Sequence, residues 1–301
     1  MTVHPVFQQF NVQQGPADPN VFHDWLGGLY PRHLIDTWPS LASEAVQPVA
    51  GEELFEWIDV LTAASEASGR FAMVELGAGW GRWGIRGALA ARHRGLTDID
   101  VRLVEAEPLH CEFARECVAL NGLTDSAHLI EAAISYSGQQ VPFIVSSESV
   151  IDARTNYGQW VYDGQTAVLP SGETYLGREV YRYGGHGCIY VESITLEEVL
   201  AGLDRVDLLD ADLQGAEKSL VENAMEVMTA KVALAHFGTH GAEIEELMRD
   251  QFRRYGWKCR WDFSLGGVRD TPYGPTDFQD GVQAWVNPAL IPSSPRIIGF
   301  S

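Results

Sequence analysis

Three glycines follow a buried-type strand in the segment MVELGAGWGRWG. Gly77, Gly79 and Gly81 come directly after Leu76 and before a predicted helix. Glycine lets the backbone turn sharply and approach a ligand at a helix N-terminus, where free N–H groups point outward. A dinucleotide fingerprint needs the spacing GxGxxG, but Arg82 stands where the third glycine should be. The spacing GxGxG favours a ligand without a pyrophosphate, and S-adenosylmethionine is the usual one in this setting. A tight turn that only packs strand on helix is the alternative.

Acidic residues near this loop are candidates for holding such a ligand. Glu75, at the end of the strand, is placed to meet the methionyl amine. The next predicted strand ends in VEAEP, and its carboxylates can accept hydrogen bonds from both ribose hydroxyls. We choose Glu107 over Glu105 because the terminal position reaches the crevice above the sheet. Glu131 and Ala132 end the third strand, where an adenine would lie.

Proton-transfer residues are expected at the ends of the fourth and fifth strands. Asp212 ends the fourth strand, and His236 and His240 flank the end of the fifth in AHFGTHG. Histidine is the usual proton-transfer residue, so His240 or His236 is the preferred catalytic base, with Asp212 orienting the imidazole. Asp212 itself is the other candidate. A divalent metal ion held by Asp210 and Asp212 is less favoured, because the sequence has no compact metal-binding spacing such as HExxH.

Predicted strands and helices that position these residues alternate along the chain, which is typical of a parallel sheet covered by helices. We expect an α/β fold of the Rossmann-like type, with seven strands, mostly parallel, and helices on both faces. The predicted strands cover 71–76, 100–106, 128–134, 206–211, 231–237, 257–263 and 281–286, and the predicted helices 82–94, 109–120, 196–203, 216–229 and 242–255.

Two regions depart from the alternation. Residues 1–69 are predicted to be an N-terminal extension with helices, and residues 70–301 the main domain. An insertion at about 146–190 is too long for an ordinary connection and predicts an antiparallel excursion or lid. Its aromatic residues form either an acceptor pocket or a self-packing hairpin or dimer surface, and His186 is a further candidate for substrate contact. They are Tyr157, Trp160, Tyr162, Tyr175, Tyr181, Tyr183 and Tyr190.

Composition argues against two classes of partner. The 301 residues include 21 Lys and Arg against 41 Asp and Glu, for a formal charge of −20. Nucleic-acid affinity rests largely on cationic side chains, so no nucleic-acid partner is expected, nor an anionic membrane. No segment predicts a secretory signal or a membrane span. We expect a cytoplasmic protein, and homo-oligomerisation stays open.

Two strings resemble the FkbM family of methyltransferases. The first, DLLDADLQGAE at 207–217, is similar to the family's fourth strand and following helix, which commonly read DLLKIDVEGAE. The second, EAEPLHCEFARECVALNGL, is similar to the family's helix that starts at Glu-Pro and ends in Asn-Gly. The resemblance covers roughly residues 70–260.

Asp212, Gly215 and Glu217 match the family string, whereas Asp210 replaces its lysine and Gln214 its glutamate. Roles of those two family side chains are therefore not carried over. The resemblance implies a class I methyltransferase that uses S-adenosylmethionine and methylates a hydroxyl oxygen, often on a natural product or a sugar.

The sequence therefore predicts an S-adenosylmethionine-dependent O-methyltransferase acting on a small-molecule hydroxyl. One rival is an NAD-dependent oxidoreductase on a similar sheet, against which the missing third glycine argues. The other is a non-catalytic module that uses the fold for protein association, against which the intact glycine loop argues.

Overall fold

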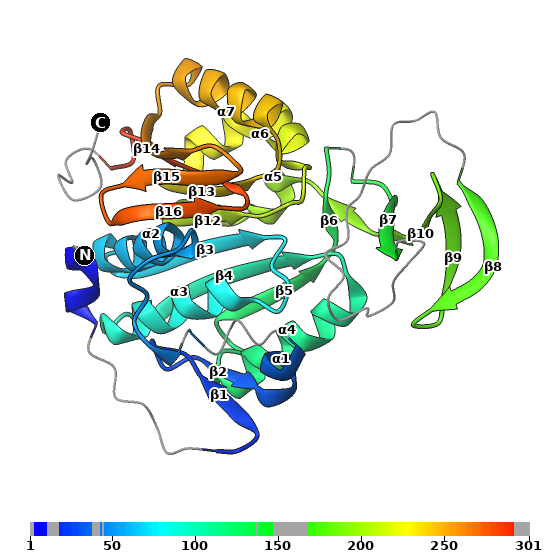
Figure 1. The fold of residues 1–301 in the computed structure, drawn as a ribbon, viewed down its shortest axis with the longest axis horizontal. Coiled ribbons are helices and arrows are strands. Elements are labelled where there is room, and N and C mark those ends of the chain that lie inside the picture. The colour runs from blue at the N-terminus through cyan, green and yellow to red at the C-terminus, as the bar shows by residue number, and fades with distance from the viewer. Residues whose placement is uncertain are drawn as a thin grey trace.

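Seven strands form the central sheet of the computed structural model, which describes residues 3–10, 18–37, 43, 45–136, 138–146 and 168–291. The strand order is β14-β17-β13-β12-β3-β4-β5. Neighbours from β13 to β5 pair in parallel, and β17 is antiparallel to both β13 and β14. Figure 1 shows this sheet between two groups of helices. Its strands are β3 (Arg70–Leu76), β4 (Asp98–Glu105), β5 (Ala127–Glu131), β12 (Leu208–Ala211), β13 (Leu234–Thr239), β14 (Lys258–Phe263) and β17 (Gly281–Val286).

This order settles the class of sheet. In chain order the strands read 3-2-1-4-5-7-6, with the last strand inserted antiparallel. A classic dinucleotide-binding sheet reads 3-2-1-4-5-6 with all strands parallel. The fold is therefore the Rossmann-like fold of class I methyltransferases, and the predicted fold class is confirmed.

Helices cover both faces because each presents an apolar stripe to the sheet. One buried cluster joins α2, α3 and α4 to the sheet, and a second joins α5, α6 and α7 to the other face. The third predicted helix, 196–203, is helical only over its first four residues. The helices are α2 (Glu53–Glu66), α3 (Arg82–His93), α4 (Pro108–Leu120), α5 (Leu196–Val199), α6 (Glu217–Lys231) and α7 (Ala242–Arg254).

The N-terminal part packs onto the same core. Helix α2 contributes buried residues to the cluster that contains α3 and the sheet. Before it come the short 3-10 helix η1 (Pro5–Gln9), the hairpin of β1 (Val21–His23) and β2 (Leu29–Pro31), and helix α1 (Arg32–Thr37). Asn121, at the end of α4, accepts a hydrogen bond from the Leu29 N–H and donates one to the Leu29 carbonyl. These two hydrogen bonds connect the N-terminal part to helix α4.

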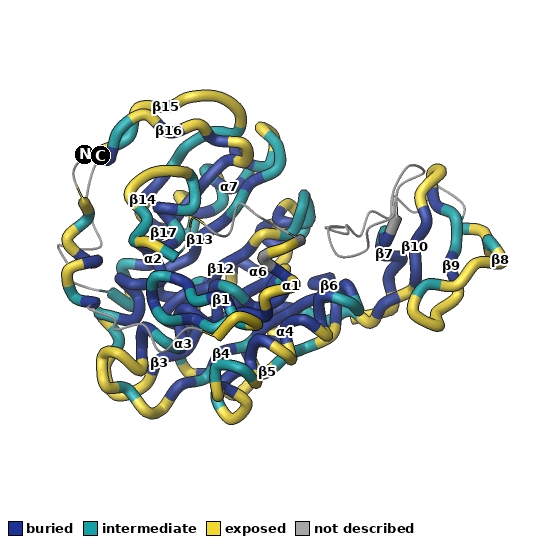
Figure 2. Tube along the Cα trace, turned by 60° about the horizontal axis from the view of Figure 1, so that its bottom comes forward, coloured by how far each residue is buried: buried dark blue, intermediate teal, exposed yellow. Residues whose placement is uncertain are grey.

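A four-stranded antiparallel sheet makes up the described part of the predicted insertion. Its order is β7-β10-β9-β8, and it projects from the body of the molecule in Figures 1 and 2. The outermost strand, β8, is mostly exposed. Residues 147–167, which include Tyr157, Trp160 and Tyr162, lie outside the described residues. The strands are β7 (Val141–Ser146), β8 (Leu169–Tyr175), β9 (Arg178–Tyr183) and β10 (His186–Val191).

Smaller pairings complete the fold. The third predicted strand, 128–134, is divided: β5 stays in the central sheet, whereas β6 (Ala133–Ile134) pairs in parallel with β11 (Ser193–Ile194). A hairpin of β15 (Gly267–Thr271) and β16 (Gly274–Phe278), not foreseen from the sequence, connects β14 to β17. No helix in the described part of the chain is long and apolar enough to cross a membrane.

Candidate active site

The glycine loop lies flat against the carboxyl ends of two neighbouring strands. The N–H groups of Gly77 and Ala78 both donate to the Val104 carbonyl, at 2.9 and 3.0 Å. Gly77 has φ 77°, and a Cβ built there would lie 1.9 Å from the Asp212 carbonyl oxygen. A side chain at this position therefore meets both backbone strain and a clash with rigid backbone. The space beside Gly79 is open, with no atom within 4 Å of a built Cβ.

Glu75 joins the end of β3 to the start of α3. Its carboxylate accepts hydrogen bonds from the N–H groups of Trp83 at 3.3 Å and Gly84 at 2.7 Å, both in the first turn of α3. These are helix N–H groups without an intrahelical partner. Burial, followed by the charge of Asp210, raises the pKa of Glu75 to about 8. Glu75 lines the cleft described below.

Glu105 is the last residue of β4 and lines a small pocket, whereas Glu107 lies two residues beyond the strand. Glu105 accepts hydrogen bonds from the N–H groups of Gly79, Ala106 and Glu107, at 2.7–2.8 Å, and lines a small pocket. Glu107 is the fully buried N-cap of α4, where it accepts from the His110 N–H at 2.8 Å and from the Tyr175 hydroxyl. The choice of Glu107 as the pocket residue does not match this placement.

The end of β5 supplies apolar rather than acidic groups to the same pocket. Glu131 is half exposed and forms an ion pair with Arg115, so its carboxylate is directed away from the pocket. Ala132 lines the pocket, together with Ala133, Ile134 and Phe143 of β7. An apolar wall of this kind suits a flat aromatic ring.

Two adjoining cavities run along the carboxyl ends of the central strands. The small pocket lies beside the ends of β4 and β5, and a cleft of about 410 Å³, named here the acidic cleft, lies beside α2, β12, β13 and β17. Both cavities are lined by Gly77, Asp212 and Gln214, so they meet at these residues. The acidic cleft is lined by Glu52, Glu53, Glu56, Glu75, Asp210, Asp212 and Asp280, against the cationic Arg82 and the imidazole of His236.

His240 lies next to Asp212, which lines both cavities. His240 Nε2 lies 3.3 Å from Asp212 Oδ1, and its Nδ1 lies 2.9 Å from the buried carboxylate of Glu217. Burial opposes protonation of His240, but the hydrogen bond to Glu217 and the charges of Glu217, Asp212 and Asp280 raise its pKa to about 9. At neutral pH His240 is therefore largely protonated and a poor proton acceptor.

The loop after β12 creates this arrangement through unusual backbone angles. Gln214 has φ 51° and Gly215 has φ 106°, and the turn lets Glu217 accept from the N–H groups of Leu213 and Gly215. A positive φ at a residue other than glycine costs free energy and is often found at functional sites. The turn thus holds Glu217 in place, and Glu217 in turn positions His240 beside Asp212.

His236 is oriented by a residue that the sequence analysis missed. Its Nδ1 lies 2.8 Å from Oδ2 of Asp59, which is fully buried on α2. Burial disfavours the charge on Asp59, but Arg260 and His236 hold the pKa of this carboxyl below its ordinary value. The only sequence signal was an aspartate within the apolar run of α2, which a buried helix face tolerates only when the charge is paired.

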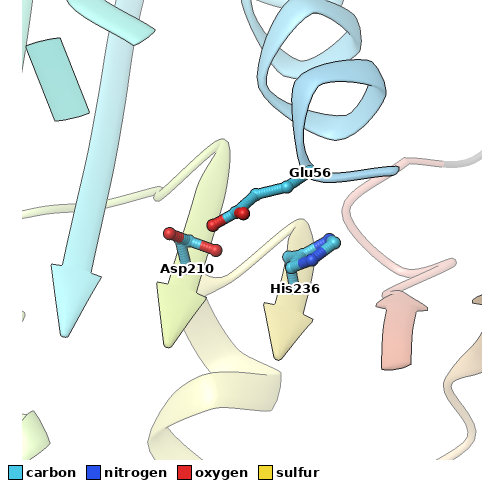
Figure 3. A group of neighbouring side chains, drawn as sticks. All are labelled: Glu56, Asp210 and His236. Atoms are coloured by element: carbon cyan, nitrogen blue, oxygen red, sulfur yellow. The ribbon is translucent and has the colours of Figure 1, made fainter. Parts of the chain in front are cut away.

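Asp210 lies apart from Asp212. Strand register places Asp210 beside Glu75 on one side and His236 on the other, on the sheet face that α2 covers. Glu56 of α2 reaches this group and is hydrogen-bonded to Asp210 (Figure 3). Burial and mutual repulsion raise the pKa of both carboxyls. Among the described residues, the side chains that could hold a metal ion fall into two groups, one with Asp210 and the other with Asp212, and no described group contains both aspartates.

The described tyrosines of the insertion line neither cavity. Tyr181 and Tyr190 contact each other edge to face at 5.1 Å, and Tyr183 is buried. His186 is exposed at the start of β10. The hydroxyl of Tyr175 donates a hydrogen bond to Glu107, the N-cap of α4, and so contacts the end of β4 only through that residue.

Sequence comparison agrees with the fold. No family model matches the chain. A protein of Jannaschia sp. (strain CCS1), named "Putative methyltransferase", is 25% identical over 260 residues, which cover 85% of this chain and 88% of that protein. The chain thus combines the class I methyltransferase strand order with sequence similarity to a methyltransferase over most of its length.

Comparison of the structure finds weak similarity to solved methyltransferases. Precorrin-6y C5,15-methyltransferase from Geobacter metallireducens GS-15 has a TM-score of 0.40 at 9% identity, with coverage of 75% of this chain and 86% of that chain. The human methyltransferase 10 domain containing protein has a TM-score of 0.41 at 10% identity, with coverage of 77% and 81%. The class of fold stands on the strand order given above.

Proposed function

We propose that this protein is a methyltransferase that transfers the methyl group of S-adenosylmethionine to a hydroxyl oxygen of a small molecule. One observation carries the proposal: the carboxylate of Asp212 lies where the small pocket and the acidic cleft meet. A donor in the small pocket and an acceptor in the acidic cleft would place the reacting atoms beside this carboxylate. A positioned carboxylate is a suitable base for an alcohol in such a step.

The residues of the small pocket fit the donor's adenosine half. Glu105 offers a carboxylate beside the glycine loop for the ribose hydroxyls, and the alanines at the end of β5 with Phe143 offer an apolar slot for the adenine. On the other side of Gly77, Glu75 offers a carboxyl group to the methionyl ammonium, whose positive charge would favour the ionised form of this buried group. The loop with Gly77, Gly79 and Gly81 would lie between the adenosine half and the methionyl half of the donor.

S-Adenosylmethionine supplies a methyl group on a sulfonium, which is already a good leaving system. The protein's part is to align the acceptor and to remove its proton. We assign proton removal to Asp212. The half-exposed carboxylate is partly withdrawn from water by the cleft walls, which raises its pKa, whereas the protonated His240 and the Gln214 amide act in the opposite direction. His236, with Asp59, also has the geometry of an oriented base, but it lines only the acidic cleft.

The FkbM resemblance supports this assignment at three positions. Asp212, Gly215 and Glu217 match the family string, and they form the strand end, the turn and the His240 support described above. We propose membership of that family on these residues and on the Glu-Pro helix start at α4.

A second acceptor class is favoured by one observation. The acidic cleft gathers seven carboxylic acids, named above, against Arg82 and His236. Such a cleft attracts a cation, and a protonated amine would be drawn to it. Methylation of a small amine is therefore the alternative to methylation of a hydroxyl.

A panel of acceptors tests the proposal. Methyl transfer from labelled S-adenosylmethionine is measured with diols, sugars and phenols on one side and with their amino analogues on the other. We expect labelled ethers from the hydroxyl compounds, identified by mass spectrometry. Transfer only to the amino analogues would replace the proposal by the second acceptor class.

Binding of the demethylated cofactor tests the donor half by itself. Removing one charged hydrogen-bond acceptor costs about 1.5–3 kcal/mol, so Glu105→Gln should weaken S-adenosylhomocysteine binding by roughly 10- to 100-fold in calorimetry. Glu131→Gln is the matched control and should bind like the unmodified protein, because its carboxylate pairs with Arg115 at the surface. Equal losses in the two variants would contradict the placement of the ribose.

A further inference from the structure

Three side chains with metal-binding atoms converge on the floor of the acidic cleft. One carboxylate oxygen each of Glu56 and Asp210 and one ring nitrogen of His236 lie within 4.8 Å of one another. They come from three elements, α2, β12 and β13, as Figure 3 shows. Asp210 and His236 are each 3% exposed, and both line the cleft with Glu56. The group is thus buried in the protein but open to a ligand from the cleft.

The hydrogen bonding of His236 prepares one nitrogen for a metal ion. The ionised carboxylate of Asp59 fixes the proton on Nδ1, at 2.8 Å. In a neutral imidazole the lone pair then lies on Nε2. Among the described residues Nε2 has no hydrogen-bond partner, although the side chain is almost wholly buried. A carboxylate behind a histidine in this way is the usual support of a metal-binding imidazole.

The carboxyl groups around these three side chains would also be stabilised by a bound cation. The buried carboxyls of Glu75 and Asp210 lie side by side, with the half-buried carboxyl of Glu56 next to them, and the nearby Arg82 forms an ion pair with Glu53 at 2.8 Å. A buried carboxylate is costly unless it is paired or binds a metal. The second candidate group, around His240, is different, because both ring nitrogens of the protonated His240 already face carboxylates, those of Glu217 and Asp212.

We propose that Glu56, Asp210 and His236 bind one divalent transition-metal ion. One imidazole and two carboxylates are a donor set that suits Mn²⁺, Fe²⁺ or Zn²⁺ better than Ca²⁺, which prefers oxygen ligands alone. Three protein ligands leave positions open toward the acidic cleft. A hydroxyl of the acceptor bound there would have its pKa lowered, and Asp212 would take the proton. This last role rests on the proposed function, whereas metal binding does not.

Titration of the chelator-treated full-length protein with Mn²⁺, without donor or acceptor, tests the site. We expect one tightly bound ion per chain, with a ¹⁴N coupling in its pulsed electron paramagnetic resonance spectrum. Asp210→Asn, which keeps the shape of the side chain, should weaken binding by more than tenfold, and His236→Gln should abolish the ¹⁴N coupling. Asp59→Asn should weaken binding by roughly 10- to 100-fold, because Asp59 positions the imidazole.

Asp280→Asn is the control for charge alone, since Asp280 lines the same cleft outside the three-residue group. It should retain Mn²⁺ binding. Equal weakening in Asp280→Asn and Asp210→Asn would show diffuse attraction to an acidic surface and would overturn the proposal, as would the lack of saturable binding to the unmodified protein. Circular dichroism confirms that each variant is folded. Failure of methyl transfer with intact Mn²⁺ binding would contradict the proposed function and not the metal site.

Discussion

Replacing Asp212 by asparagine is expected to lower kcat by about 10²- to 10⁴-fold, the range for loss of a positioned proton-transfer group. The amide has nearly the same shape and can still accept hydrogen bonds from Gln214 and His240, so the loop should keep its conformation. Affinity for S-adenosylhomocysteine should change little. A loss in kcat without a loss in cofactor binding is the sign of an interaction made in the chemical step.

The measurement combines single-turnover methyl transfer with calorimetric binding of S-adenosylhomocysteine. An unchanged rate in Asp212→Asn would remove Asp212 from the active site. A parallel fall of rate and cofactor affinity would assign Asp212 to binding of the donor, since it also lines the small pocket.

Removing Asp24 is expected to cause the largest loss of stability. Asp24 and Arg86 are both fully buried, with Arg86 Nε 3.0 Å from Asp24 Oδ2. The guanidinium lies against the rings of Trp57 and Trp83, at 4.2 and 4.4 Å from their centroids. Asp24→Ala leaves this arginine charge buried without its carboxylate, so the free energy of unfolding should fall by about 3–5 kcal/mol.

Denaturant unfolding measures this loss, and a surface pair provides the control. Asp98 lies 3.7 Å from Arg70, with side chains that are 67% and 42% exposed. Asp98→Ala should cost less than about 1 kcal/mol, because water screens exposed pairs. Similar losses in the two variants would mean that Asp24 does not neutralise a buried charge. The pair matters for the site because it joins the β1–β2 hairpin to α3, the helix that begins at the glycine loop.

Most of the strands of the central sheet could be predicted from the sequence. Each of the seven predicted segments contributes a strand, since a strand buried on both faces leaves a short apolar run that local inspection detects. The division of 128–134 into β5 and β6, and the hairpin β15–β16, were not foreseen. The division depends on the pairing of β6 with β11, which is distant in the sequence. The hairpin begins with a short, mostly exposed strand that has little apolar pattern.

The choice between Glu105 and Glu107 shows where local reasoning ends. Their spacing of two residues would place both side chains on one face of an extended strand. In the structure, however, β4 stops at Glu105 and the chain turns into α4. Glu107 becomes the N-cap, a role that aspartate, serine or threonine more often fills. Whether an acid caps a helix or faces a ligand depends on one backbone turn, which residue spacing does not encode.

By itself the sequence determined the sheet and its glycine loop, together with the acid Glu75 and the carboxylate Asp212 at the ends of β3 and β12, because strand ends and turns are local features. Only the tertiary structure decided which distant side chains meet them. Strand register sets Asp210 beside His236, and the packing of α2 brings Glu56 and Asp59 to these two from more than a hundred residues away. Such contacts arise from packing of whole elements, so no pattern within one segment could reveal them.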